Sequence, residues 1–244
     1  MSDPRVSLIS ERLRNIHRII AVSSGKGGVG KSLVASVLAL ALARRGVKVG
    51  LFDIDFTSPA SHVILGISGA QPKEKKGIVP PVVHGLKYMS IIYYARDRAS
   101  PLRGADFSNA LIELLAVTVW GKLDFLVIDM PPGISDATLD ILRLIRRAEF
   151  LVVTTPSRLA FETVRKFIDL LLESNVPVLG VIENMKMTNS NFIRREVEKR
   201  SVKFWGEIPF DKNLEESIGN AEKLLSTEFG KALKRMTTEN LDLG

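Results

Sequence analysis

A glycine- and lysine-rich run near the N-terminus carries the clearest chemical signal in this sequence. It fits the pattern G-x-x-x-x-G-K-[ST], beginning at Gly25 and ending with Lys31 and Ser32. Glycines leave backbone N–H groups free to hold an anion, because no Cβ atom blocks the approach of a phosphate. The residues predicted to bind a nucleotide here are Gly25, Lys26, Gly27, Gly28, Val29, Gly30, Lys31, Ser32 and Leu33.

The two lysines of this loop have different predicted roles. Lys31 can reach the β- and γ-phosphates, and the hydroxyl of Ser32 can ligate Mg²⁺. Lys26 is either a surface charge or an extra positive charge at the transferring phosphoryl group. A lysine on the rim of its own loop is poorly placed to fold back onto its own γ-phosphate. The phosphates of a neighbouring subunit are therefore the easier target for Lys26.

Carboxylates at the ends of neighbouring strands would complete a site for Mg²⁺ and ATP, and two segments supply them. Asp129 follows four apolar residues, as in a Walker B strand, and is predicted to hold Mg²⁺ through water. Asp53 and Asp55 are two positions apart, so they face the same way if the strand runs that far. Asp55 is predicted to position the attacking water. For both Asp53 and Asp55 the alternative role is a cap on the following turn.

The residues after Asp129 predict a defined turn rather than the start of a helix. Two prolines, of which Pro132 is the second, precede Gly133. Such a turn suits a switch loop beside the γ-phosphate. The N–H group of Gly133 is predicted to sense that phosphate.

The order of the predicted elements gathers these residues at one edge of a sheet. Short β-rich runs, several of them continuously apolar, alternate with helical stretches. This alternation predicts an α/β fold, a doubly wound and mostly parallel sheet flanked by helices. The predicted strands cover residues 18–23, 47–53, 88–93, 125–129, 150–154, 178–182 and 202–207. The predicted helices cover residues 32–45, 107–118, 137–146, 160–174, 191–200 and 221–236, and residues 69–85 are predicted to form an exposed loop or small hairpin.

Length and composition favour an ordinary globular protein. The chain has 244 residues, of which 45% are hydrophobic, and one domain over residues 1–244 is predicted, with a helical lead-in over residues 1–17. These residues include no cysteine and three histidines, which excludes disulfides, a thiol nucleophile and a thiolate-bound metal. No apolar run reaches roughly 18 residues and no signal-peptide layout is present, so a cytoplasmic protein without a membrane span is predicted.

The net charge of +7 arises within residues 1–50, which hold 9 Lys/Arg and 2 Asp/Glu. A basic segment can indicate nucleic acid, an acidic membrane or a phosphate ligand. Lys26 and Lys31 place part of this charge at the predicted phosphate site. The four arginines before residue 20 have no predicted role.

These motifs resemble those of the Mrp/ApbC branch of the ParA/MinD-type P-loop ATPases, whose relatives include the nitrogenase iron protein. The loop is similar to the deviant loop of that superfamily, with its signature lysine at Lys26. The narrower resemblance rests on four later segments. They are residues 102–104 (LRG), 120–133 (WGKLDFLVIDMPPG), 152–156 (VVTTP) and 176–185 (VPVLGVIENM).

The resemblance implies roles for the catalytic residues. Lys26 looks like the lysine that reaches ATP across a dimer, so the family pattern implies a homodimer that sandwiches nucleotide. Asp55 looks like the switch I aspartate that orients water, with Asp53 beside it in the same switch. Asp129 resembles the Walker B aspartate.

The resemblance also implies a second switch and a base-binding region. Gly133 and Asp136 fall in switch II. Asn184 resembles the asparagine that reads the adenine edge, and an amide has the donor and acceptor that adenine N7 and N6 require. The alternative role of Asn184 is that of a turn or cap residue. Pro209 and Phe210 lie in a segment that looks like the loop packed against the base.

The sequence departs from the family at one point with a chemical consequence. Mrp-type proteins usually carry C-x-x-C shortly after the E-N-M segment, and two subunits pool these cysteines to hold a bridging iron–sulfur cluster. Here residues 186–192 read KMTNSNF. Thioether and carboxamide groups do not replace thiolates at a cluster. The predicted cofactors are therefore ATP or ADP and Mg²⁺, without an iron–sulfur cluster on the chain's own cysteines.

The leading prediction is a Mg²⁺-dependent ATPase of the Mrp type that acts, as a homodimer, on an unidentified partner protein in iron–sulfur or metal-cofactor assembly. A heterodimer with a cysteine-bearing paralogue stays open. One alternative is a positioning ATPase like ParA or MinD, but the basic helix 194–200 is diluted by glutamates and the segment 229–236 is short. Neither nucleic acid nor a membrane is therefore a predicted partner. A further alternative is a regulatory subunit that binds nucleotide and hydrolyses little.

Overall fold

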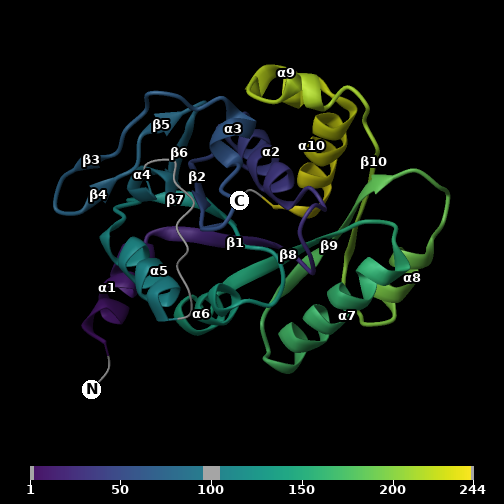
Figure 1. Cartoon of the computed structure of the whole chain (residues 1–244), viewed down its shortest axis with the longest axis horizontal. Helices are drawn as coiled ribbons and strands as arrows, with labels where there is room; N and C mark the ends of the chain where they lie inside the picture. The colour runs from purple at the N-terminus through teal and green to yellow at the C-terminus, as the bar shows by residue number, and fades with distance from the viewer. Residues whose placement is uncertain (1–2, 96–104, 243–244) are drawn as a thin grey trace.

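The computed structural model of the chain describes residues 3–95 and 105–242. Its central feature is an eight-stranded sheet with the strand order β10-β9-β8-β1-β7-β2-β6-β5. Every pairing in this sheet is parallel except that of β5 with β6. The α/β fold with a mostly parallel sheet is thereby confirmed (Figure 1). The segment 102–104, one of the four family matches, lies outside the described residues.

The strands have bounds close to those predicted from apolar runs. The sheet comprises β1 (Ile16–Ser24), β2 (Val49–Asp53), β5 (Val82–Val83), β6 (Leu86–Ser90), β7 (Leu123–Asp129), β8 (Ala148–Thr154), β9 (Val178–Lys186) and β10 (Phe204–Pro209). A separate two-stranded hairpin pairs β3 (Lys73–Glu74) with β4 (Ile78–Val79), within the predicted loop or hairpin.

Helices cover both faces of the sheet. The face below the sheet in Figure 1 carries α1 (Pro4–Leu13), α5 (Ala105–Val117), α6 (Asp136–Leu144), α7 (Arg158–Glu173) and α8 (Phe192–Glu198). The face above it carries α2 (Lys31–Ala43), α3 (Ser61–Leu65), α9 (Ala221–Ser226) and α10 (Glu228–Asn240). A short helix, α4 (Ile92–Ala95), follows β6. None of the helices in the described part of the chain combines the length and the apolar character needed to span a bilayer.

The core explains why the inner strands read as continuous apolar runs. Successive residues of a strand point to opposite faces, so a strand covered on both sides buries every side chain. In β7, Leu126 and Ile128 join the cluster under α5 and α6, whereas Phe125 and Val127 join the cluster under α2. The two layers of helices are thus held on one sheet by alternate residues of the same strands.

The predicted helix over residues 221–236 is two helices in the structure. Thr227 has extended dihedral angles and caps the second helix, because its side chain accepts a hydrogen bond of 2.9 Å from the N–H group of Gly230. Gly230 is also in close contact with the first helix, since a Cβ on it would lie 2.1 Å from the carbonyl oxygen of Leu224. The chain therefore turns at Thr227, and α9 and α10 pack separately against α2. At the other end of the chain, the predicted lead-in over residues 1–17 is helical only to Leu13, because β1 already begins at Ile16.

Candidate functional site

The glycine-rich loop joins β1 to α2, as the motif requires. Two of its glycines lie against other elements. A Cβ on Gly25 would be 2.8 Å from the backbone nitrogen of Val164 in α7, and a Cβ on Gly30 would be 2.3 Å from Nδ2 of Asn184 in β9. Gly30 also has a φ of 83°, in the left-handed region. The loop is therefore pressed between the sheet and α7 at positions where no other residue fits without movement.

Lys31 lies at the centre of a charged cluster at the end of β1. Its side chain is 6% exposed, and its ammonium group forms a buried ion pair with Asp129 Oδ1. The ammonium also donates to the Ser32 hydroxyl at 3.1 Å and lies 3.9 Å from Asp55 Oδ2. One lysine thus connects the two carboxylates that the sequence predicted for different roles.

Asp129 ends β7 and faces Asp53 across the β2–β7 pairing. Its side chain is fully buried, and burial raises its pKa while the neighbouring Lys31 ammonium acts in the opposite direction. The second oxygen, Oδ2, is buried and accepts no hydrogen bond from the described residues. Asp129 therefore has an uncommitted buried acceptor beside the loop.

Of the three clustered aspartates, Asp53 has a structural role. Oδ1 accepts a hydrogen bond from the Asp55 N–H at 3.1 Å, and Oδ2 accepts from both the N–H, at 3.2 Å, and the hydroxyl of Ser61. The Ser61 hydroxyl in turn contacts the Tyr88 hydroxyl at 2.9 Å. Burial and the nearby Asp129 carboxylate raise the pKa of Asp53 to about 7. Asp53 holds the turn after β2, the alternative role considered for it from the sequence.

Asp55 lies on the open side of the same turn. Its Oδ1 accepts hydrogen bonds from the Thr57 hydroxyl at 2.7 Å, the Thr57 N–H at 3.2 Å and the Ser58 N–H at 3.1 Å. Its Oδ2 is the atom that faces Lys31. The carboxylate is thereby fixed in orientation by the turn that follows it and directed toward the loop. These contacts leave Asp55 able to orient a water molecule.

A cavity of about 380 Å³ lies over the loop and is lined by these groups. Its walls include Lys26, Lys31, Ser32, Asp55 and Pro132. Such a volume is within the range of small-molecule sites, roughly 300–1,000 Å³. The structure thus brings the predicted phosphate loop, one switch carboxylate and one residue of the second switch to one cavity.

The remaining residues of the predicted second switch are Gly133 and Asp136, which lie on and after the turn that follows β7. The N–H group of Gly133 donates to the carbonyl of Ser24 at 2.8 Å, which ties the turn after β7 to the end of β1. Asp136 is exposed at the first position of α6. Neither Gly133 nor Asp136 lines the cavity.

The three residues predicted to meet the base lie outside this cavity. Asn184 on β9 is 2% exposed, and its Nδ2 donates to the carbonyl of Val29 at 2.9 Å. Pro209 ends β10 at the surface, and the Phe210 side chain beyond it is half exposed. Asn184 therefore contacts the loop without lining the cavity, and its predicted contact with adenine stays a prediction.

Several lining residues were not predicted from the sequence. Thr57 and Ser58 line the cavity and hold Asp55, and Ile64 and Ile218 form an apolar part of its wall. A signal for Thr57 was available, because a hydroxyl residue two positions after an aspartate favours an Asx-type turn. Ile218 follows a short 3₁₀ segment far along the chain, and nothing local marks it.

The donor set suits a Mg²⁺ ion bound together with nucleotide phosphates. The Ser32 hydroxyl and the uncommitted Oδ2 of Asp129 are hard oxygen ligands of the kind that Mg²⁺ takes. No group of three or more His, Cys, Asp or Glu residues that could hold a metal by itself occurs in the residues described. Phosphate oxygens and water would therefore supply the other ligands.

A family model described as "ParA: NUBPL iron-transfer P-loop NTPase" matches residues 15–241. The chain belongs to this family. Two curated relatives are each described as "Iron-sulfur cluster carrier protein". The relative from Pseudomonas fragi is 45% identical over 177 residues, 71% of this chain and 62% of the relative. The relative from Aquifex aeolicus is 42% identical over 179 residues, 72% of this chain and 49% of the relative. The match thus covers from about half to just under two thirds of the length of these relatives.

The fold of this chain is also similar to that of a solved structure. A nucleotide-binding protein from Archaeoglobus fulgidus, in complex with ADP, superposes with a TM-score of 0.76 and 31% identity. The match covers 90% of this chain and 92% of that one. The fold and the phosphate loop therefore place the chain among the P-loop NTPases.

Proposed function

We propose that this protein is a Mg²⁺-dependent ATPase that works as a homodimer on a partner protein. The observation that carries the proposal is the buried Lys31 ammonium, held by Asp129 and facing Asp55 where β1 meets the loop. A lysine at that place neutralises transferred phosphate, and a fixed carboxylate beside it orients water. The ADP bound to the relative from Archaeoglobus fulgidus supports adenine nucleotide as the ligand.

In the proposed reaction, Lys31 changes partners. The loop N–H groups and Lys31 hold the β- and γ-phosphates, which frees the Asp129 carboxylate from its ion pair. Asp55 orients a water molecule whose oxygen bonds to the γ-phosphorus as the bond to the bridging oxygen breaks. The products are ADP and inorganic phosphate, with the water protons shared between phosphate and solvent. The Ser32 hydroxyl and, through water, the Asp129 carboxylate would hold Mg²⁺, which would neutralise phosphate charge.

Lys26 supports the homodimer in this proposal. Its carbonyl accepts a hydrogen bond of 2.9 Å from the Ser24 hydroxyl, which fixes the backbone of the loop. Its side chain is exposed at the mouth of the cavity and forms no ion pair with the residues described. Lys26 is therefore free to reach the phosphates held by a second copy.

The partner is proposed to belong to iron–sulfur or metal-cofactor assembly. The two curated relatives are described as iron–sulfur cluster carriers, whereas these 244 residues contain no cysteine. The segment 187–191, where the resembling family carries its cysteine pair, is exposed and follows β9. A cluster would therefore be the cargo of a partner's cysteines rather than a group held by cysteines of this chain.

Steady-state ATP turnover tests the ATPase proposal. Wild-type protein with Mg²⁺ is expected to hydrolyse ATP, and Lys31→Ala to reduce the rate by at least about 100-fold, because the phosphates lose their main cation. Lys166→Ala, at an exposed site on α7, is the matched control and is expected to keep the wild-type rate. A wild-type rate no higher than that of Lys31→Ala would show that the protein binds nucleotide without hydrolysing it.

A further inference from the structure

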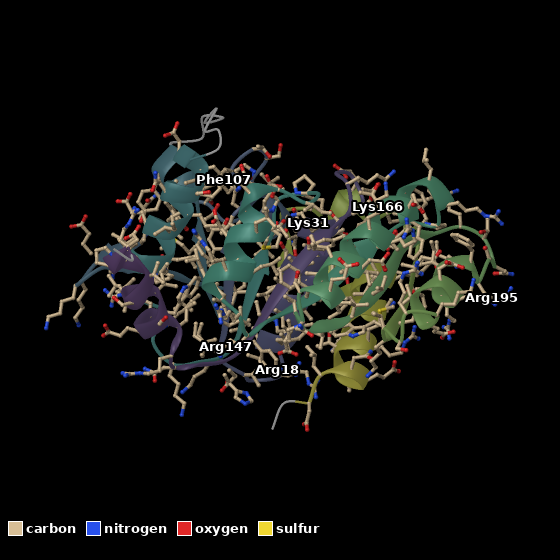
Figure 2. The ribbon with its side chains drawn as sticks, turned by 90° about the horizontal axis from the view of Figure 1, so that it is seen from below. Arg18, Lys31, Phe107, Arg147, Lys166 and Arg195 are labelled. Carbon is tan, nitrogen blue, oxygen red and sulfur yellow. The ribbon has the colours of Figure 1, made fainter. Side chains whose placement is uncertain are left out.

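A second and larger cavity lies at the opposite edge of the sheet from the phosphate loop. Its volume is about 740 Å³, and it lies between α1, the end of α6 and the turn before β8. Figure 2 shows Arg147, which lines this cavity, near the edge of the molecule opposite Lys31. None of the residues of the proposed ATPase site lines it.

Four arginines line this cavity, which we name the arginine pocket: Arg14, Arg143, Arg146 and Arg147. Apolar side chains form part of the same wall, among them the half-buried Val6 and Leu144. Such a wall combines apolar contact area with several guanidinium groups, whose planar N–H donors match the two oxygens of a carboxylate.

Arg147 builds the pocket and carries an uncompensated charge. Its guanidinium donates to the carbonyls of Leu13 at 2.6 Å, Ile16 at 2.7 Å and His17 at 3.1 Å. These acceptors join α1 to β1, so Arg147 fixes the helix that forms one side of the pocket. All three are neutral, and burial without a carboxylate partner lowers the pKa of Arg147.

The other three arginines leave the pocket strongly positive. Arg143 forms one ion pair, with Asp140 at 3.0 Å. The exposed side chains of Arg14 and Arg146 form no ion pair or hydrogen bond with the residues described. Within the described part of the chain, the four arginines around this hollow therefore form one ion pair with a carboxylate, that of Arg143 with Asp140.

This concentration is not a general property of the basic N-terminal segment. Arg5 pairs with Asp3, and Arg18 forms two hydrogen bonds with Glu149, at 2.7 and 2.8 Å. Arg12 donates to backbone carbonyls. Of the four arginines before residue 20, Arg14 is the one whose side chain has no partner among the described residues, and it lines the same pocket as Arg146.

We propose that the arginine pocket binds an acidic peptide segment with apolar side chains, contributed by a partner protein. Carboxylates would meet the guanidinium groups, and apolar side chains would pack on the half-buried side chains of Val6 and Leu144. A nucleotide base is a poorer occupant, since none of the described residues that line the pocket is aromatic and could stack on it. A nucleic acid backbone needs basic groups along an extended track, whereas these four surround one hollow. The proposal goes beyond the ATPase function, and each can fail without the other.

Binding of a defined peptide tests the proposal. The probe is the heptapeptide Glu-Glu-Leu-Glu-Glu-Leu-Glu carrying a neutral fluorescent dye, titrated with the full chain in a fluorescence anisotropy assay. The charge-reversed double variant Arg14→Glu/Arg146→Glu is compared with Lys166→Glu/Arg195→Glu. The second variant changes the net charge equally, at exposed sites on α7 and α8 that Figure 2 shows far from Arg147. Circular dichroism and thermal unfolding check that both variants are folded.

The wild type and the Lys166→Glu/Arg195→Glu variant are expected to bind the peptide with similar affinity. The Arg14→Glu/Arg146→Glu variant is expected to bind at least about tenfold more weakly, because two charge-assisted contacts are lost. A peptide with Gln at every Glu position is expected not to bind, and ATP turnover of both variants is expected to match the wild type. Equal weakening in the two double variants would overturn the proposal, as would a wild-type protein that does not bind the peptide.

Discussion

The side-chain amide of Asn184 holds the carbonyl of Val29 inside the phosphate loop, although 155 positions separate them in the chain. The Nδ2–O distance is 2.9 Å, and both residues are buried. The end of β9 therefore fixes the backbone of the loop through a residue that does not line the cavity. A residue predicted to contact the base is also a support for the site that holds the phosphates.

Replacement of Asn184 by alanine is expected to weaken nucleotide binding through both roles. The Val29 carbonyl would lose a buried partner, at a cost of about 1–3 kcal/mol, and the loop would lose its fixed position. We expect the affinity for ATP to fall more than that for tripolyphosphate. The loop would bind the phosphates of both ligands, whereas only ATP has an adenine that Asn184 could contact. Isothermal titration calorimetry measures the two dissociation constants.

Asn189→Ala is the control for Asn184→Ala, since Asn189 is exposed and its side chain has no hydrogen bond to the residues described. It is expected to leave both affinities unchanged. An equal loss for the two ligands in Asn184→Ala would show that the amide acts through the loop alone.

The contact between Gly30 and Asn184 predicts a clash that can be relieved. Gly30→Ala adds a Cβ 2.3 Å from Asn184 Nδ2 at a residue with a φ of 83°. Gly46→Ala imposes a similar φ of 82° with nothing within 4 Å of the added Cβ, so it measures the backbone strain alone, about 1–2 kcal/mol. We expect Gly30→Ala to lower the free energy of unfolding by clearly more than Gly46→Ala.

A double-mutant cycle distinguishes the clash from other effects at Gly30. In Gly30→Ala/Asn184→Ala the obstructing amide is gone, so the double variant is expected to be more stable than the sum of the single losses implies. Urea unfolding of the four proteins measures the coupling. Additive losses would mean that the loop moves away from β9 instead of meeting Asn184.

The raised pKa of Asp53 predicts that folding stability depends on pH. The folded protein keeps a proton on Asp53 up to about pH 7, whereas the unfolded chain releases it near pH 4. The folded state therefore binds more protons than the unfolded state between these values. The contribution of Asp53 to stability is fully present below about pH 4 and is lost as the pH rises to about 7, by about 1.4 kcal/mol for each unit.

Asp53→Asn isolates this contribution, because the amide has the same shape and does not titrate. We expect the unfolding free energy of the wild type, relative to that of Asp53→Asn, to fall as the pH rises from about 4 to 7. Urea unfolding at intervals of one pH unit measures the difference. A constant difference over this range would show that Asp53 is ionised in the folded protein throughout.

The sheet and the phosphate loop could be predicted from the sequence because each depends on a local pattern of residues. The apolar run before Asp129 predicts a strand, and the glycines around Lys31 predict a phosphate loop. Neither prediction depends on a residue distant in the sequence. The two-helix arrangement at Thr227 was missed because an unbroken helical pattern outweighed one capping residue. The role of Asp53 depends on Ser61, which comes close only after the chain has folded.

Distant partners also explain why the charge of the N-terminal segment could not be assigned beforehand. The partner of Arg18 is Glu149, 131 positions away, and no spacing rule connects the two. The concentration of Arg14 and Arg146 in one pocket arises because Arg147 ties the turn after α1 to the start of β8. Local spacing therefore identified the chemistry of the loop. Which arginines are paired with carboxylates and which are not could be seen only in the folded structure.

The exposed side chain of Lys26 predicts that two copies complete each other's sites. A mixture of Lys26→Ala and Asp55→Ala proteins forms heterodimers in which the Lys26→Ala copy keeps Asp55 and receives Lys26 from its neighbour. That site is expected to hydrolyse ATP, whereas the site on the Asp55→Ala copy has no residue to orient water. With random pairing, half of the dimers hold one active site of two, so about a quarter of the wild-type turnover is expected.

Each variant alone fixes the baseline for this mixture, since neither homodimer has a site with both residues. Dilution below the dimer dissociation constant, measured by analytical ultracentrifugation with ATP, is expected to abolish the recovered rate. If Lys26 acted on the phosphates of its own loop, every site in the mixture would lack one residue and turnover would stay at the baseline at all concentrations. Recovery therefore requires that the ammonium of Lys26 cross from one copy to the other.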